Sequence, residues 1–342
     1  MGSELFVKFY KSPFLALKWR SCHSSGGELA FPGMNERAIL KQICAAGMDP
    51  VAVPIGPGDD MAMLDIGAQA HEGRILVAVD QLIGGIHVDV ERVSMAEIGH
   101  KAVARCLSDV AAMAGRPVAS LVAAVLPQGC SDSAAMELFD GMRETAMRHH
   151  APIVGGDLSA HRIGHGPLTC SVTVVAVPTP NGAVERFGAE AGDVVAVTGS
   201  LGGSFGSDGA GRHMTFEPRI GEGIMLHAIL GDGLHAMIDL SDGLGTDAAH
   251  LLEHSPRLQI RIDAKAIPVA SGCTWRQAMV DGEDYELCFC ASGEIPSQVL
   301  DCPITPVGHV VERSPGDSRS VVVVDEDGNE HDLTNAGWEH VS

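Results

Sequence analysis

The chain has 342 residues, of which 45% are hydrophobic and 41 are glycine, a composition typical of a soluble α/β protein with many tight turns. Its formal net charge of −21 disfavours a nucleic-acid partner, because that affinity comes largely from Lys and Arg that neutralise phosphates. An anionic ligand such as a nucleotide would need metal ions to bind so acidic a protein.

Nine cysteines are scattered along the chain without a Cys-x-x-Cys pair. Cys288 and Cys290 stand two positions apart, which in a strand places both thiols on one face and suits neither zinc nor a local disulfide. We therefore expect reduced core cysteines and a cytoplasmic protein. No apolar run reaches the length of a membrane span, so we expect no membrane partner.

Residues 1–28 are basic and aromatic, unlike the rest of the chain. Their apolar patch is too short for a secretory signal, whereas an organelle-type address stays open. We expect an extension of unknown role there, a first domain at 29–178, and a second domain at 183–342. The Pro- and Gly-containing stretch 178–182 marks the boundary.

The first predicted helix spans 35–46, and a Gly-Pro-Gly turn then leads to Asp59 and Asp60. Adjacent carboxylates repel each other unless a cation lies between them, and oxygen ligands of this kind suit hard divalent metals. The alternative is an Asp-rich turn that caps its own backbone, which the stretch favours when taken alone. The metal site gains weight because apolar strands that end in Asp recur along the chain.

Two such strands lie in the first half. The strand at 74–79 is predicted to end at Asp80, and a second strand with two glycines ends at Asp157. A carboxylate at the tip of a buried strand is a scaffolded ligand. After the first strand, two glycines let the backbone pass close to a ligand, with His87 at their end.

A long helix is predicted over 95–114, and its second half is almost wholly apolar. Asp109 lies in that half. A carboxylate among apolar neighbours is costly unless it is paired or bound to metal, so a solvent-facing Asp109 is the weaker interpretation.

The other predicted elements are simple apolar runs, and three later motifs carry chemistry. The runs are a strand at 120–126, a helix at 132–149, strands at 168–177, 194–199 and 321–324, and a helix at 246–254.

A glycine-rich segment at 199–206 could be a phosphate loop, although it lacks the Lys of a P-loop and the Rossmann spacing. Two aspartates and a serine stand at 239–242, and an acidic turn at 282–286 leads into another strand. Trp338 is isolated, and a core or rim anchor is as good an interpretation as a ligand contact.

Taken in order from about residue 29 to the end, these motifs resemble thiamine-monophosphate kinase. That family is related to aminoimidazole-ribonucleotide synthetases, selenophosphate synthetases and a hydrogenase maturation protein. The Gly-Glu-Asp-Tyr-Glu-Leu turn and the terminal Gly-Trp-x-His separate the kinase from these relatives. The matching motifs are Gly-Pro-Gly-Asp-Asp-Met-Ala at 56–62, the segments 79–87 and 101–114, Val-Gly-Gly-Asp at 154–157, Arg-Phe-Gly-Ala at 186–189, Val-Thr-Gly-Ser-Leu-Gly at 197–202, Ile-Asp-Leu-Ser-Asp-Gly-Leu at 238–244 and the turn at 282–287.

The resemblance implies ATP-dependent phosphorylation of thiamine monophosphate to thiamine diphosphate by direct, Mg²⁺-assisted, in-line phosphoryl transfer. Such a reaction needs alignment and charge neutralisation from a protein, which several Mg²⁺ ions can supply. We assign no general base to this reaction, because the acceptor is already an ionised phosphate oxygen.

Carried over by position, the resemblance also implies the site residues. The metal ligands would be Asp60, Asp80, Asp109, Asp157, Asp239 and Asp242. The ATP contacts would be Gly156, Asp157, Arg186 and Ser241. The thiamine end would contact His87, Glu283 and Trp338, with Trp338 as a stacking face for a cationic ring and Glu283 as its matching charge.

The chain departs from the family pattern at two places. Ala78 and Val79 precede Asp80 where the family often has hydroxylated residues that help to hold metal, which would reduce one metal site to backbone contacts. Gly203 stands where the family usually has Asp, which puts the detail of that loop in doubt.

The implied fold is α/β (α+β) with two domains and the active site in the cleft between them. The N-terminal half would use a mixed sheet to form a barrel across a homodimer interface, and the C-terminal half would be an αβ sandwich. Rival interpretations are another ATP-dependent member of the superfamily and a non-catalytic nucleotide-binding scaffold. Cys22 is a poor match to the reactive cysteine of selenophosphate synthetase, and six retained aspartates oppose a scaffold, since buried acids without metal are a liability.

Overall fold

The computed structural model describes residues 54, 61–65, 73–161, 166–206 and 209–338, which all belong to one compact unit, 36–340. The expected extension, the predicted first helix and the Asp59-Asp60 turn lie outside the described residues. Among the described helices, none is long and apolar enough to cross a membrane.

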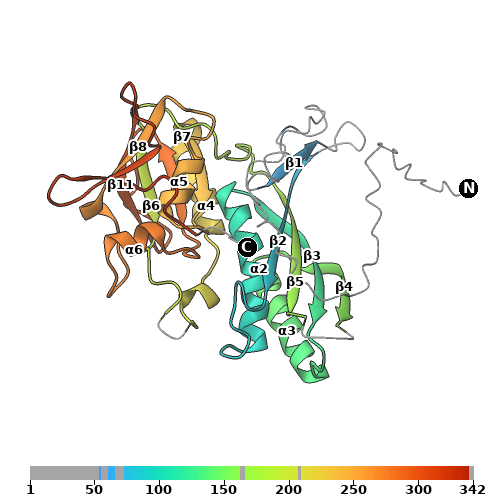
Figure 1. Cartoon of the computed structure of the whole chain (residues 1–342). Coiled ribbons are helices and arrows are strands. Elements are labelled where there is room, and N and C mark those ends of the chain that lie inside the picture. The colour runs from blue at the N-terminus through green and yellow to red at the C-terminus, as the bar shows by residue number, and fades with distance from the viewer. Residues whose placement is uncertain (1–53, 55–60, 66–72, 162–165, 207–208, 339–342) are drawn as a thin grey trace, which may run out of the picture. The chain divides into compact units, whose positions relative to one another are not determined.

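Five strands form the N-terminal sheet, in the order β1-β2-β5-β3-β4 (Figure 1). They are β1 (Ala62–Asp65), β2 (Arg74–Ile83), β3 (Arg116–Leu126), β4 (Ile153–Ala160) and β5 (Thr169–Val177). Among these described strands only the pair β3–β4 is parallel, and the other three pairs are antiparallel. The sheet is therefore mixed, as expected, and its edges in the described residues are β1 and β4.

Two strands of this sheet run past the aspartates that were expected at their tips. β2 continues three residues beyond Asp80, because Gln81 to Ile83 keep pairing with β5. β4 continues three residues beyond Asp157, alongside the end of β3. The prediction that each strand ends at its carboxylate was wrong, because the alternation of side chains does not reveal where pairing to a neighbour stops.

Two helices, α2 (Met95–Ala112) and α3 (Asp132–Arg148), lie against each other, and α2 packs on β2 and β5 (Figure 1). α2 begins with a capping box between Ser94 and Glu97. The helices approach closely at two glycines: a Cβ on Gly99 would lie 2.2 Å from Leu138 O, and one on Gly141 would lie 2.2 Å from the backbone of α2. This contact fixes the position of α2, which carries Asp109.

A second, eight-stranded sheet has the order β13-β12-β8-β11-β6-β9-β7, with β10 paired to β11. Its strands are β6 (Val194–Thr198), β7 (Leu234–Asp239), β8 (Leu258–Asp263), β9 (Leu287–Ala291), β10 (Gln298–Val299), β11 (Cys302–Glu312), β12 (Val321–Val324) and β13 (Glu330–Asp332). Its helices are α4 (Ile220–Leu230), α5 (Leu244–His250) and α6 (Trp275–Val280), and η1 is a short turn at Arg212–Met214. Of the strand pairs described in this sheet, only β8–β12 is parallel.

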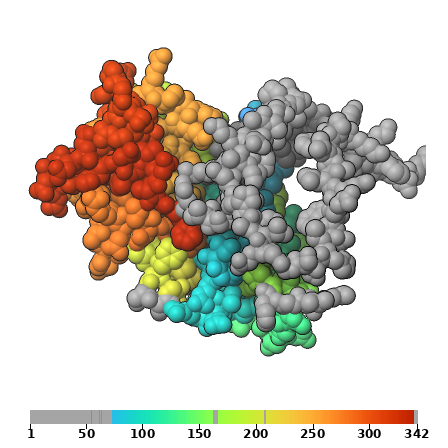
Figure 2. All heavy atoms as spheres, viewed as in Figure 1, coloured from blue at the N-terminus to red at the C-terminus, as the bar shows by residue number. Residues whose placement is uncertain are grey.

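Apolar side chains cover both faces of this sheet. Val195 and Val197 of β6 belong to the core that contains α5 and α6. Ala196, between them, belongs to the core that contains α2 and α4. In the space-filling view the segment with η1 and α4 (yellow) lies against α2 (cyan) (Figure 2). The expected fold class, α/β with mixed sheets, is confirmed.

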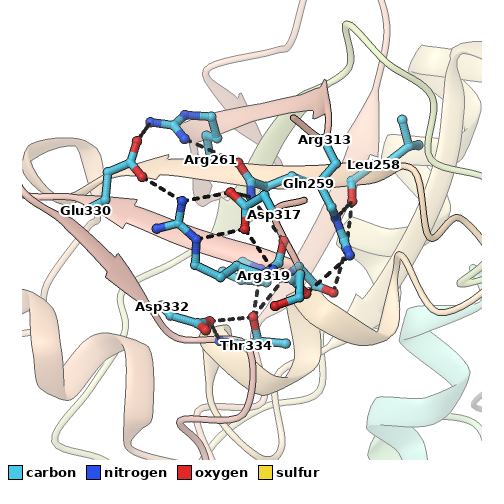
Figure 3. Close-up of polar contacts among 12 residues, drawn as sticks. Leu258, Gln259, Arg261, Arg313, Asp317, Arg319, Glu330, Asp332 and Thr334 are labelled. Atoms are coloured by element: carbon cyan, nitrogen blue, oxygen red, sulfur yellow. Dashed lines mark hydrogen bonds and ion pairs between the residues drawn. The ribbon is translucent and has the colours of Figure 1, made fainter. Parts of the chain in front are cut away.

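A polar network ties the outer strands of this sheet together (Figure 3). Arg319 pairs with Asp317 at 2.7 Å and with Glu330 of β13 at 2.8 Å. Arg261 of β8 reaches the same Glu330 at 2.5 Å, so one set of ion pairs joins β8, β13 and the segment that precedes β12. None of the predicted site residues belongs to this network.

Candidate functional site

A pocket of about 70 Å³ gathers residues from distant parts of the chain. Five predicted site residues are among those that line it: His87, Ser241, Asp242, Glu283 and Trp338. Its other lining residues are Ile86, Arg105, Phe205, Gly282 and Tyr285. A pocket this small holds part of a ligand, since drug-sized ligands occupy about 300 Å³ or more.

Glu283 is held by two residues that the sequence did not single out. Lys101 Nζ lies 2.5 Å from Glu283 Oε2, and His213 Nδ1 lies 2.8 Å from the same oxygen. Burial alone would raise the pKa of Glu283, but the hydrogen bond with His213 and the charge of Lys101 lower it to about 2. Glu283 also has a φ of +61°, an uncommon backbone conformation for a residue with a side chain. The carboxylate is therefore ionised at neutral pH and fixed through one oxygen.

Lys101 is wholly buried in the apolar helix α2. Its ammonium group also donates to the backbone oxygen of His87 at 2.6 Å. Burial lowers the pKa of Lys101 to about 8, although Glu283 favours its charged form. Lys101 thus links two predicted substrate contacts, His87 and Glu283. A lysine within an apolar run was the signal in the sequence that could have indicated it.

The ring of His87 is fixed by a backbone contact. Its Nδ1 accepts from the N–H of Ile83 at 2.9 Å, so the neutral ring carries its proton on Nε2. The Nε2 of His213 donates to Gly209 O at 3.1 Å, and its Nδ1 lies 2.7 Å from Lys101 Nζ and 2.8 Å from Glu283 Oε2.

Asp239, on the second sheet, forms a hydrogen bond with helix α2. β7 ends at Asp239, as the sequence predicted, and its Oδ2 accepts from Ser108 Oγ at 2.6 Å. Asp109 follows Ser108 on that helix and is half-buried. Burial, with the charges of Asp80 and Asp242, raises the pKa of Asp239 to about 6. Four of the predicted metal ligands therefore meet where α2, β2 and β7 come together.

Asp80 lies on the helix-covered face of β2, paired with an arginine. Arg105 Nε lies 2.9 Å from Asp80 Oδ2, and Arg105 Nη2 donates to Oδ1 at 3.2 Å. Arg105 was not predicted as a site residue, and it lines the pocket.

The turn that carries Ser241 and Asp242 is shaped by Asp247 of α5. Asp247 Oδ2 accepts from the backbone N–H groups of Asp242 and Gly243, at 2.9 and 3.0 Å. The N–H of Trp338 donates to Asp242 O at 2.8 Å, which brings the end of the described chain to this turn. The side chain of Trp338 is 50% exposed and lines the pocket, so it is not a core anchor.

Arg186 also lies near the carboxylates. Its charge lowers the pKa values of Asp239 and Asp247 against the effect of burial, which raises both. This places an arginine, expected to contact ATP, beside the proposed metal ligands.

Asp157 and Gly156 are not brought to this cluster. Asp80, Val172, Val122 and Gly156 stand in one row across the sheet, three strand spacings or roughly 14 Å from end to end. Asp157 belongs to the next row, so its side chain leaves the opposite face of the sheet from Asp80. Gly156 is required where it stands, because a Cβ there would lie 2.0 Å from Val122 O.

Backbone N–H groups of the glycine-rich segment 199–206 donate hydrogen bonds to carboxylates of the protein itself. The N–H of Gly202 donates to Asp284 at 3.0 Å, and the N–H of Gly203 donates to Asp281 at 2.9 Å. These groups are therefore not directed at a phosphate. A Cβ at Gly203 would lie only 2.5 Å from Cys273 Sγ, and the φ of +70° there is strained for a residue with a side chain, so Asp at this position would require Cys273 to move.

The acidic turn at 282–286 holds this segment in place. Asp284 accepts from Arg212, at 2.5 Å from its Nη2, and Glu286 pairs with Arg219 at 2.6 Å. The three acids of the turn thus have different partners, and of the three only Glu283 lines the pocket.

Comparison with known proteins gives one consistent result. A family model described as AIR synthase related protein, N-terminal domain, matches residues 58–177. A thiamine-monophosphate kinase from Rhodopirellula baltica is 36% identical over 284 residues, which cover 77% of this chain and 85% of that protein. The thiamine-monophosphate kinase of Mycobacterium tuberculosis is 32% identical over 79% of this chain and 86% of its own length.

Solved structures agree with these relatives. The structure of AaThiL complexed with AMPPCP and TMP is 25% identical, has a TM-score of 0.70, and covers 89% of this chain and 95% of that chain. The HypE-HypF complex gives a TM-score of 0.65 at 15% identity, with 86% of this chain and 97% of that chain covered, which shows the fold alone.

Proposed function

The chain belongs to the thiamine-monophosphate kinase family, and we propose that it transfers the γ-phosphoryl group of ATP to thiamine monophosphate, giving thiamine diphosphate and ADP. The observation that carries this for the chain itself is the pocket, which brings His87, Ser241, Asp242, Glu283 and Trp338 together from positions spread over the chain. The chain is thus a kinase whose acceptor is a phosphate group.

The carboxylate cluster fits Mg²⁺. Asp239 is buried, and the charges of neighbouring acids raise its pKa, so a cation among them would relieve their repulsion. Asp109, Asp239 and Asp242 would hold the ions, with Asp60 as a further ligand. Bound Mg²⁺ would neutralise the charge that develops as the phosphoryl group moves in line between two anionic reactants. Asp80 differs from these aspartates as a metal ligand, because Arg105 already pairs with its carboxylate.

The residues at the pocket fit the two ends of thiamine monophosphate. The half-exposed ring of Trp338 offers a face to a cationic ring, and the ionised Glu283 offers the opposite charge. Ser241 and Arg186 would contact ATP. No residue is assigned as general base, since the acceptor oxygen is ionised at neutral pH.

We also propose a homodimer. The face of the N-terminal sheet opposite α2, which none of the described helices covers, carries exposed apolar side chains, with Val79 63% and Leu121 42% exposed. These two residues stand in one row, paired through Thr173 of β5. Because Asp157 leaves that same face, it would serve an ATP site that a second copy of the chain helps to form. A barrel closed by two such sheets would cover the apolar surface.

A direct assay tests the reaction. Purified protein is incubated with Mg-ATP and thiamine monophosphate, and with thiamine in parallel, and the thiamine phosphates are separated by chromatography. Thiamine diphosphate formed from the monophosphate alone, with ADP in equal amount, is the expected result.

A scaffold or another superfamily activity would behave differently. No product, together with a rise in melting temperature on adding Mg²⁺ and a non-hydrolysable ATP analogue, would contradict the kinase reaction and keep the nucleotide site. A further rise on adding thiamine monophosphate is expected for the kinase and not for a scaffold.

A further inference from the structure

Arg105 makes three contacts at the start of the Asp80 turn. Its Nη1 donates to the backbone oxygen of Gln81 at 2.8 Å, and its Nη2 and Nε face the two oxygens of the Asp80 carboxylate. The side chain is 13% exposed, and the nearby charges of Asp80, Asp109 and Glu283 all favour its charged form. Arg105 is therefore a permanent cation located inside the carboxylate cluster.

Both oxygens of the Asp80 carboxylate already lie against N–H groups or a positive charge. Its Oδ1 already accepts from the N–H of Gln81 at 2.7 Å and from Arg105 Nη2. Its Oδ2 faces Arg105 Nε at 2.9 Å. An ion at this carboxylate would have to displace the guanidinium or lie against another positive charge.

The two residues before Asp80 have apolar side chains and supply no oxygen ligand. Ala78 is buried under α2, where its backbone oxygen accepts from Cys106 Sγ at 3.7 Å. Val79 points to the uncovered face of the sheet and is 63% exposed. A Mg²⁺ ion prefers several oxygen ligands, and at Asp80 the Arg105 guanidinium takes their place.

We propose that the Arg105 guanidinium replaces one of the metal ions of the site, so that Asp80 acts as the partner of Arg105 and not as an ion ligand. The inference rests on the proposed kinase function. Arg105 lines the pocket, and it would meet the phosphate charge of a bound reactant there as the missing ion would. The chain would then work with fewer Mg²⁺ ions than its carboxylates suggest.

Counting bound ions tests this without turnover. Mn²⁺ is titrated into the full chain with a non-hydrolysable ATP analogue and thiamine monophosphate, and free Mn²⁺ is measured by electron paramagnetic resonance. Arg105→Gln should bind one more Mn²⁺ per chain than the wild type, because it frees the Asp80 carboxylate. Arg105→Lys keeps the charge and should bind the wild-type number.

Arg143→Gln is the matched control, since Arg143 forms an exposed ion pair with Asp140 and should leave the count unchanged. An equal count in the wild type and Arg105→Gln would overturn the proposal. If Arg105→Gln does not fold, Asp80→Asn decides: an unchanged count supports the proposal and the loss of one ion overturns it. The product assay on the wild type is separate, so failure of the kinase function would be recognised on its own.

Discussion

Lys101 and Glu283 stand 182 positions apart in the sequence, yet Lys101 Nζ lies 2.5 Å from Glu283 Oε2. Lys101 is fully buried, and the Glu283 side chain is 11% exposed. The pair joins helix α2 to the acidic turn, so it decides where the free end of the Glu283 carboxylate stands in the pocket. Oε1 is the oxygen left for a ligand; among the described residues, Tyr285 Oη lies near it at 3.4 Å.

Lys101→Met should weaken both stability and substrate binding. The methionine fills the space but leaves a buried carboxylate without its cation, which costs about 3 kcal/mol or more of unfolding free energy. The KM for thiamine monophosphate should rise roughly tenfold while the KM for ATP stays nearly constant. Urea unfolding and steady-state kinetics measure the two effects.

Arg143→Met is the control for that variant, because its exposed pair with Asp140 contributes at most about 1 kcal/mol. Equal KM values for thiamine monophosphate in Lys101→Met and the wild type would show that Lys101 is structural only.

Glu283→Gln should reveal a stability term that depends on pH. The pKa of Glu283 is lowered to about 2 in the folded protein from 4.5, so its contribution is complete above pH 4.5 and is lost as the pH falls toward 2. At neutral pH the shift corresponds to roughly 3 kcal/mol. The gap in unfolding free energy between wild type and Glu283→Gln should therefore narrow as the pH falls through this window. A difference in unfolding free energy that stays constant over this pH range would contradict the lowered pKa of Glu283.

Asp109→Asn should stop turnover and leave the fold intact. Asp109 is half-buried beside the Ser108–Asp239 contact, and its amide analogue has the same shape but loses the charge that holds a cation. We expect kcat to fall at least about 100-fold, with a melting temperature near that of the wild type without metal. Near-wild-type rates would remove Asp109 from the metal set.

Leu121→Glu should separate the proposed dimer. Leu121 is on the uncovered face of the N-terminal sheet, and a charge there opposes burial against a second copy. Light scattering after size exclusion should give the mass of a dimer for the wild type and of a monomer for the variant. Met147→Glu is the control, since Met147 is 60% exposed on α3 and should not change the mass. A monomeric wild type would refute the dimer.

The local elements were largely readable from the sequence. Apolar periodicity placed α2, α3, β5, β6 and β12 within a few residues of their observed bounds. Spacing is informative there because a helix or strand buries one face, and its side chains must repeat accordingly. The helices α4 and α6 and the strands β8 and β11 were not predicted; α6 has only six residues, and β11 contains Pro and Gly.

By itself, the sequence determined the chemistry of the chain: the aspartate-containing motifs, their order, and the family to which they belong. Only the tertiary structure decided which charges meet. The pairing of Arg105 with Asp80 and of Lys101 with Glu283 depends on how α2 packs on two sheets, and no local pattern encodes it. The same holds for Asp157, because the pairing register across the strands decides which face of the sheet its carboxylate leaves.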